Sequence, residues 1–227
     1  DEESYSSGMR TAVPMLKELR DTYGLSYRVL INSEPNEKEN GKIVAFTGSV
    51  GKLLPVVLVQ GKSVHVGNYR QGINPLGIVS RIIAATEGDA SLADRCGEEM
   101  TPPPAWIYLR DRKQHYDVSL PQRVAACANF MTYTKTPEDV MYILRNVAQE
   151  AVAEALQHVD DGLSMEVISS AELLNRAAAY PGFDVFYENV KNNSFIRLQE
   201  GETTYAQETI RMIEAILDFT GMTDPLT

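Results

Sequence analysis

The chain has 227 residues, of which 44% are hydrophobic and 23% charged, a composition that supports a folded core. Its formal net charge is −10 and its basic residues are scattered, which argues against a nucleic-acid partner because phosphate backbones need clustered Lys and Arg. No apolar stretch approaches the roughly 20 residues of a membrane span. The two cysteines lack disulfide density and metal-ligand spacing, and no signal peptide is recognisable, so we expect a cytoplasmic protein without a membrane partner.

The first fifty residues predict a helix followed by two strands. Apolar residues at helical spacing indicate the helix over 9–21. The runs 26–33 and 42–48 are typical of strands, and a polar loop separates them. Gly48 and Gly51 then indicate a turn or loop after the second strand.

The middle of the chain alternates strands and helices. A strand block at 52–66 precedes a helix at 73–87, a loop at 88–104, strands at 105–112 and 124–134, a helix at 137–158 and a possible short strand at 164–168. This order predicts an α+β fold of the split βαβ, or ferredoxin-like, kind, with two helices on one face of an antiparallel sheet. An edge strand of such a sheet is a natural dimerisation surface.

The last part of the chain predicts two further helices. Residues 170–180 and 206–219 have helical patterns, and the second ends before Gly221. The Gly, Asn and Pro residues between them indicate irregular structure over 181–204.

Acidic residues supply the first candidate site. Asp1, Glu2 and Glu3 are adjacent, which costs energy through like-charge repulsion. They form either a solvated acidic terminus or a site in which one carboxylate binds a metal and its neighbour accepts a proton from bound water. Glu34, at the end of the 26–33 strand, is either an ordinary loop acid or a ligand at the carboxyl end of a strand.

A histidine supplies the second candidate site. His65 lies in GKSVHVGNYRQGIN, residues 61–74. It is either a structural histidine or a hydrogen-bond donor to a developing oxyanion or a substrate carboxylate. Gly67 and Gly72 would let the backbone approach a ligand closely.

The order of these motifs resembles one family. DEESYSSGM, a helix, a strand ending in SEP, a Gly-marked strand and GKSVHVGNYRQGIN occur in that order in zinc-dependent aminoacylases, carboxypeptidases and deacylases of the succinyl-diaminopimelate desuccinylase type. GKSVHVG, GEEMTPPPAWIYLRDRKQHYDV and TKTPEDV are similar, more narrowly, to the RocB-type arginine-utilisation proteins of that metallopeptidase superfamily. The resemblance covers most of residues 1–158.

The resemblance implies roles for the acidic residues. Glu2 matches the family's general base, and Glu3 matches the adjacent metal ligand. Glu34 matches the carboxylate that binds one of two zinc ions. The intact protein would then be a dinuclear-zinc hydrolase that cleaves an amide or peptide bond of a small amino-acid derivative, linked to arginine degradation.

The resemblance also implies a lid. His65 matches the lid histidine that reaches into the partner subunit's active site of a homodimer, and Gly72 and Asn74 match the Gly-x-Asn that follows it and would bind substrate. The expected domains are a catalytic-domain segment, a ferredoxin-like lid that dimerises, and a connector with a return helix. Their ranges are 1–50, 51–168 and 169–227.

Departures from the family pattern leave alternatives open. The upstream His-x-Asp segment and bridging Asp would precede residue 1, and the last His ligand would follow residue 227, so this internal segment alone should hold an incomplete zinc site and be inactive. The late-lid Arg of the family is missing from YDVSLP and NFMTY, which fits an inactivated relative. A non-catalytic dimerisation or small-molecule-binding module is the alternative, since the fold alone does not fix function.

Overall fold

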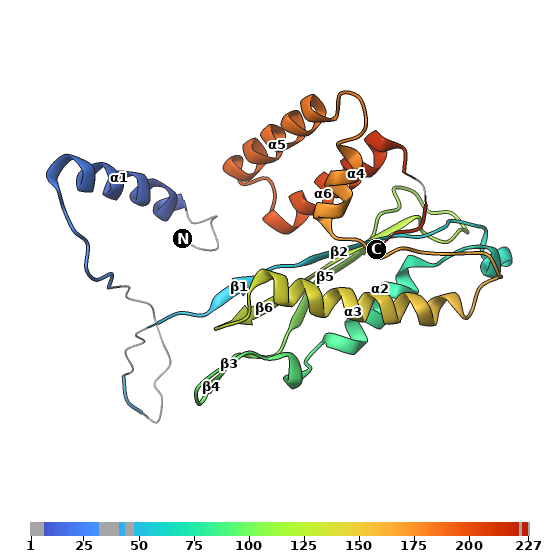
Figure 1. The fold of residues 1–227 in the computed structure, drawn as a ribbon, viewed down its shortest axis with the longest axis horizontal. Coiled ribbons are helices and arrows are strands. Elements are labelled where there is room, and N and C mark those ends of the chain that lie inside the picture. Colours follow the sequence, from blue (N-terminus) through green and yellow to red (C-terminus); the bar gives the residue numbers. More distant parts are fainter. Residues whose placement is uncertain (1–6, 32–40, 44–47, 223, 227) are drawn as a thin grey trace. The chain divides into compact units, whose positions relative to one another are not determined.

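A computed structural model of the chain describes residues 7–31, 41–43, 48–222 and 224–226 (Figure 1). The chain divides into two compact units, Asp1–Ser49 and Val50–Thr227. Helix α1, Ser7–Tyr23, belongs to the first unit, and all other named helices and strands belong to the second. Within the residues described, no helix combines the length and the apolar character that crossing a membrane requires.

The first unit contains the predicted helix but not the predicted strand that follows it. Helix α1 covers the expected range 9–21. Residues 25–31 form no strand, and Val29, Leu30 and Ile31 are 77%, 81% and 88% exposed. A strand exists only where a partner supplies ladder hydrogen bonds, and no described residue pairs with this segment. The strand prediction is therefore wrong for 26–31, and most of the predicted strand 42–48 lies outside the described residues.

The second unit is built on an antiparallel sheet with β6 at its centre. The strands are β1 (Gly51–Leu53), β2 (Val56–Gln60), β5 (Ala105–Asp111) and β6 (Arg123–Thr132). β1 and β2 pair with successive lengths of one edge of β6, and β5 pairs with the other edge. Pro55 lies at the break between β1 and β2, and its carbonyl still accepts a hydrogen bond from the Ala128 N–H at 3.1 Å. The predicted block 52–66 is thus a strand only as far as Gln60.

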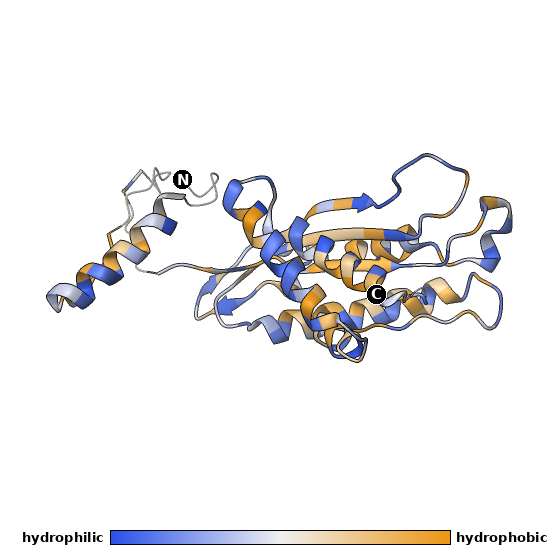
Figure 2. Cartoon of the chain, turned by 90° about the horizontal axis from the view of Figure 1, so that it is seen from above, coloured by the Kyte–Doolittle hydropathy of each residue, from blue (hydrophilic) through white to orange (hydrophobic). Residues whose placement is uncertain are grey.

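Helices cover both faces of this sheet (Figure 1). On one face, α2 (Pro75–Thr86) and α3 (Pro137–Leu156) pack on Val59, Val124 and Ala126. On the other face, α4 (Ser170–Ala177), α5 (Phe183–Glu200) and α6 (Tyr205–Thr220) form a core with Leu58 and Ala125. Figure 2 shows the strands largely in the hydrophobic colour, while the helices carry both colours. Alternate residues along each strand therefore pack into two separate cores, one on each face of the sheet.

The predicted helices over 73–87, 137–158, 170–180 and 206–219 are confirmed, but the irregular segment 181–204 is wrong, because most of it is α5. This helix has no clear apolar stripe. Its beginning is fixed instead by aromatic packing, in which the Phe186 and Phe219 ring centroids lie 4.2 Å apart and those of Phe183 and Tyr187 lie 5.5 Å apart. Tertiary packing decides this element rather than local pattern.

The predicted fourth strand of the sheet is not formed. In the segment 164–168, only Glu166 makes a bridge, and its partner is Leu226 rather than β2. Leu226 in turn bridges Gln60 at the end of β2. The strand, helix, strand, strand, helix order and the α+β class are confirmed, with three helices on the second face that the prediction did not place there.

A buried carboxylate ties the 88–104 connection to the turn before α3. This connection contains a short 3₁₀ helix, Ala90–Leu92, and the hairpin β3 (Arg95–Cys96) and β4 (Glu99–Met100). Asp94 is 4% exposed, and its Oδ2 accepts the backbone N–H groups of Tyr133, Thr134 and Lys135 at 2.8, 2.7 and 2.7 Å. Burial alone would raise the Asp94 pKa, but these three N–H donors outweigh it and hold that pKa well below its usual range.

Replacing Asp94 by Asn should destabilise the second unit by about 2–4 kcal/mol at neutral pH, because Asn has one acceptor oxygen where Asp has two. Its amide nitrogen would face either the three N–H donors at the Oδ2 position or the Arg95 N–H at the Oδ1 position. The folded-state pKa of Asp94 is lowered, so its contribution is complete above the unfolded pKa of about 3.9 and is lost as pH falls below it. The Asp94→Asn variant should therefore show a flatter loss of stability on acidification. Denaturant unfolding followed by the fluorescence of Trp106, the single tryptophan, measures both effects.

The matched control is Asp89→Asn. This half-buried carboxylate accepts one backbone N–H, from Ser91 at 2.8 Å, and should contribute much less. Equal unfolding midpoints for the two variants would show that Asp94 does not anchor the connection.

Candidate functional site

The candidate site in the described part of the chain is the loop 61–74, which begins directly after β2. The loop is closed at its neck by paired backbone hydrogen bonds between Lys62 and Ile73, at 3.0 and 3.1 Å. A Cβ atom on Gly61 would lie 2.2 Å from the Ile73 carbonyl oxygen. A Cβ on Gly72 would lie 2.5 Å from Cγ2 of Val64 and 2.7 Å from the Lys62 carbonyl oxygen. Glycine is thus required at both positions by close approach of the backbone.

His65 lies in the middle of this loop and is exposed. The adjoining backbone pairs with residues 118–120, since the Val66 N–H donates to the Val118 carbonyl at 3.0 Å and the Leu120 N–H donates to the Val64 carbonyl at 2.8 Å. The imidazole Nδ1 accepts the Gly67 N–H at 3.1 Å. In neutral imidazole the proton then sits on Nε2, which is a hydrogen-bond donor. No residue of the described ranges hydrogen-bonds this Nε2, so it can serve a ligand.

Asn74 and Gly72 support the loop from its far end. The Asn74 Oδ1 accepts the Leu76 N–H at 3.1 Å and caps helix α2, with Pro75 in the first helical position. Gly72 donates its N–H to the Tyr69 carbonyl at 3.1 Å. Both residues therefore hold the backbone that carries His65, and substrate binding by them stays a prediction.

The predicted acidic residues are not brought to His65 by the described structure. Glu2, Glu3 and Glu34 lie outside the described residues, within the first unit. Among the residues whose positions are described, no three His, Cys, Asp or Glu side chains converge in a way that could hold a metal ion. The described part of the chain thus does not fit a metal centre of its own.

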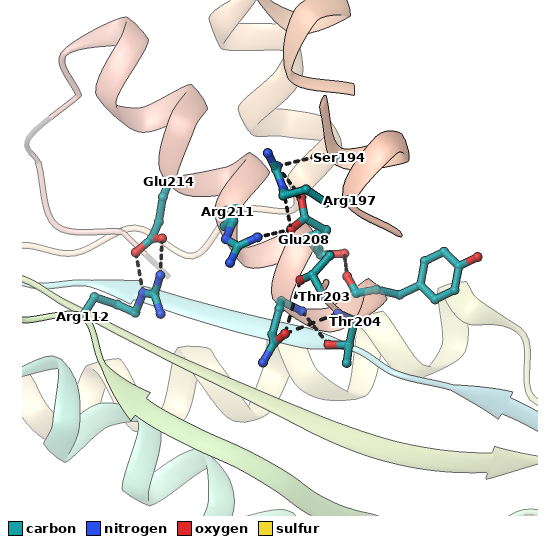
Figure 3. Close-up of polar contacts among 11 residues, drawn as sticks. Arg112, Ser194, Arg197, Thr203, Thr204, Glu208, Arg211 and Glu214 are labelled. Atoms are coloured by element: carbon teal, nitrogen blue, oxygen red, sulfur yellow. Dashed lines mark hydrogen bonds and ion pairs between the residues drawn. The ribbon is translucent and has the colours of Figure 1, made fainter. Parts of the chain in front are cut away.

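An open polar groove of about 890 Å³ lies beside the end of β5, the loop after it and helix α6. Arg112 donates two hydrogen bonds to Glu214, both at 2.8 Å (Figure 3), and Arg123 pairs with Asp218 at 2.7 Å. The Glu214 carboxylate raises the pKa of Arg112 against the opposing effect of burial. The exposed Arg110 also lines the groove and has no ion-pair partner among the described residues. Its guanidinium could bind a carboxylate there.

Sequence reasoning missed this groove. The basic run Arg110, Arg112 and Lys113 is visible in the sequence, but its acidic partner Glu214 lies about one hundred residues further along the chain. The run therefore reads as an ordinary solvated surface until the tertiary contacts are known.

A second polar cluster is structural. Glu208 of α6 is 2% exposed and accepts hydrogen bonds from Arg197 of α5, the closest at 2.6 Å, and from Arg211 (Figure 3). Burial alone would raise the Glu208 pKa, but the hydrogen bonds from Arg197, Ser194 and Thr203 lower it to about 2. The ion pair between Arg197 and Glu208 joins α5 to α6, and the Glu208 carboxylate is fully engaged in these contacts.

Comparison with known proteins identifies relatives of this chain. No protein-family model matches it. It is 32% identical over 164 residues to Protein RocB of Bacillus subtilis (strain 168), a match that covers 71% of the chain and 29% of that protein. It is also 32% identical over 162 residues to the uncharacterized protein YqjN of the same organism, covering 70% and 30%. The chain thus spans less than a third of the length of these curated relatives, and its resemblance to the RocB type is confirmed over the matched stretch.

Replacing Gly72 by Ala should destabilise the second unit by about 1–3 kcal/mol, because the added methyl group would overlap Val64 and the Lys62 carbonyl. The matched control is Gly77→Ala in helix α2, where the nearest atom is the flexible Arg81 Nη1 at 3.3 Å. That change should stabilise the unit by about 0.5–1 kcal/mol, since Ala favours helix over Gly. Urea unfolding followed by Trp106 fluorescence tests the pair, and a neutral Gly72→Ala variant would show that the loop neck is not tightly packed.

Proposed function

We propose that this chain is the lid-bearing part of a metal-dependent hydrolase that cleaves an amide or peptide bond of a small amino-acid derivative. The observation that carries the proposal is His65, an exposed imidazole on a glycine-necked loop with Nδ1 occupied and Nε2 available as a donor. A donor fixed in this way suits a developing oxyanion, because its orientation is set before the reaction. The sequence similarity to RocB supports the same family of activities.

The proposed domains follow the sequence motifs. Residues 51–168 would form a ferredoxin-like lid, supported by the order β2, α2, β5, β6, α3 and by both helices packing on one face. Residues 1–50 would belong to a catalytic domain of the aminoacylase, carboxypeptidase and desuccinylase superfamily, and 169–227 would connect back to it. The link to arginine degradation rests on the resemblance of the motifs to RocB-type proteins.

The proposed catalytic groups are divided between the two units. Glu2 would act as the general base that takes a proton from the attacking water, and Glu3 and Glu34 would bind metal. Two zinc ions are the proposed metals, and a bound divalent cation supplies the chemistry of lowering the pKa of water. The described residues hold no cluster of metal-binding side chains, so the metal ligands proposed in this chain are those of the two acidic motifs.

His65 would act across a dimer interface, stabilising the oxyanion in the partner subunit. The edge of the sheet at β5 supports this proposal. Within the described ranges β5 pairs with β6 along one side and with no strand on the other, and Ile107 and Leu109 on it are 59% and 47% exposed. Exposed apolar side chains on an edge strand favour pairing with another chain.

The catalytic assignment is tested in the longer protein that contains this chain, with acylated and peptide-linked amino acids as substrates and zinc, manganese or cobalt added. Glu2→Gln should abolish turnover without lowering metal content, because it removes the base and no metal ligand. His65→Ala should lower kcat by about 10²–10³, the usual effect of losing one oxyanion donor.

The matched control for His65 is His158→Ala, which removes an exposed histidine in the turn after α3 and should leave kcat unchanged. Turnover that survives Glu2→Gln would refute the assignment of the base. Tight ligand binding without turnover in the unmodified protein would favour a small-molecule-binding module.

Dimerisation is tested on the chain itself by light scattering, which should give twice the monomer mass. The double variant Ile107→Lys, Leu109→Lys should weaken the dimer by about tenfold or more, since charges on an edge strand oppose pairing. The control is Val185→Lys on α5, which is 70% exposed and outside the sheet edge. A unit that stays monomeric at high protein concentration would contradict the proposed interface.

A further inference from the structure

An apolar slot of about 560 Å³ runs along the edge of β2 that faces away from β6. Helices wall the slot on both faces, with Leu144 and Ala148 of α3 on one and Leu173 and Leu217 of α4 and α6 on the other. Val56, Val57 and Leu58 form its near side, and Val167 and Ile168 form its far side. The slot thus has the outline of a missing strand between β2 and the segment 166–168.

The backbone of β2 presents unpaired groups to this slot. The Ala128 N–H donates to the Pro55 carbonyl and the Gly61 N–H donates to the Gln122 carbonyl, so the odd-numbered residues of this stretch point their polar groups at β6. The N–H and C=O groups of Val56, Leu58 and Gln60 therefore point into the slot. Those of Gln60 bond Leu226, whereas those of Val56 and Leu58 have no partner among the described residues. Leu58 is only 8% exposed, where an unpaired backbone group is costly.

The first residues of a strand already occupy the entrance of the slot. The Gln60 N–H donates to the Leu226 carbonyl at 2.7 Å, and the Leu226 N–H donates to the Gln60 carbonyl at 2.8 Å. On the other side, the Glu166 N–H donates to the Pro225 carbonyl at 3.3 Å. The fully buried Gln60 side chain holds the approach, since its Nε2 donates to the carbonyls of Met222 and Asp224, both at 3.0 Å.

We infer that the slot holds one extended apolar strand of the same polypeptide, continuing from Leu226 antiparallel to β2 and parallel to residues 166–168. The antiparallel Gln60–Leu226 bridge fixes the register: the second residue after Leu226 lies opposite Leu58, and the fourth lies opposite Val56. Both faces of this strand would be covered by helices, so it should be apolar at nearly every position.

The geometry favours this in-line strand over the edge of a second copy. Helices overhang the β2 edge on both faces, so a flat sheet edge from another chain could not reach it, whereas a single strand can enter from Leu226. The match to only 29% of Protein RocB is consistent with further polypeptide in proteins of this type. The inference does not depend on the proposed hydrolase activity.

The test adds Val-Ile-Val-Ile and a polar tail after residue 227 and measures amide hydrogen exchange. The Val56 and Leu58 amides, which face the slot, should exchange at least about 100-fold more slowly than in the unextended chain. The Val57 and Val59 amides already face β6 and serve as internal controls. The melting temperature should rise by several degrees, because two backbone pairs and apolar surface become buried.

The matched control extension is Pro-Ile-Pro-Ile, with proline at the two positions opposite Leu58 and Val56. Proline cannot donate to the Leu58 and Val56 carbonyls, and its ring stands where the paired strand would lie, so this extension should give much less protection. In the Val-Ile extension, Leu226→Pro removes the N–H that bonds the Gln60 carbonyl and should abolish the protection. Unchanged Val56 and Leu58 exchange in the Val-Ile chain would overturn the inference. Protection that grows with protein concentration would overturn it as well, since the strand would then come from a second copy.

Discussion

The structure depends on a central strand that is buried on every side. Residues Val124, Ala125, Ala126, Cys127 and Ala128 of β6 are all fully buried, and β6 is paired along both edges. Its small side chains let helix layers approach from both faces of the sheet. Larger residues would overpack one layer or the other, because interiors are close-packed.

The same strand sets the position of the candidate site. The ladder between β2 and β6 continues past the end of β2, where the Gly61 N–H donates to the Gln122 carbonyl at 2.8 Å. The loop that carries His65 is then paired to residues 118–120, which lead into β6. The imidazole is exposed, yet its backbone belongs to the ordered edge of the core, which is the arrangement that a fixed hydrogen-bond donor needs.

The sequence alone predicts a helix correctly where capping residues mark its beginning. Thr136 and Asp139 form the capping box that begins α3, with Pro137 in the first turn, and the helix begins where the sequence predicts. Asn74 and Pro75 do the same for α2. These contacts join residues only a few positions apart, so they can be inferred without knowing the fold.

The sequence alone predicts an element wrongly where the residues that stabilise it are distant in the chain. Helix α5 contains Asn192 and Asn193 and lacks a regular apolar stripe, but Arg197 on it pairs with the buried Glu208 of α6. The strand predicted at 164–168 has the right residues, yet Leu226 takes the place beside Gln60 that it would have occupied. Both outcomes depend on long-range competition for partners, which hydrophobic period and propensity do not contain.

The same distinction between local and distant signals applies to the residues of the candidate site. His65 could be selected from the sequence because glycines at fixed positions signal a close-packed loop, and the structure shows Gly72 packed against Val64. The polar groove lined by Arg112 could not be selected from the sequence, since its partner Glu214 is 102 residues away in the chain. The acidic motif around Glu2 lies outside the described residues, so its relation to His65 rests on the resemblance alone.

The two edges of the sheet have different surroundings and therefore suit different partners. β5 is half-buried at Trp106 and Tyr108 and exposed at the residues between and after them, as expected of an edge strand that is partly open to solvent. The β2 edge lies between α3 on one face and α4 and α6 on the other, with mostly apolar walls. An open, half-polar edge can pair with another subunit, whereas a walled apolar edge can accept only a single strand, because unpaired backbone groups in an apolar slot must find a partner. The two edges therefore suit the two proposed pairings, β5 with another subunit and β2 with a single strand of the chain.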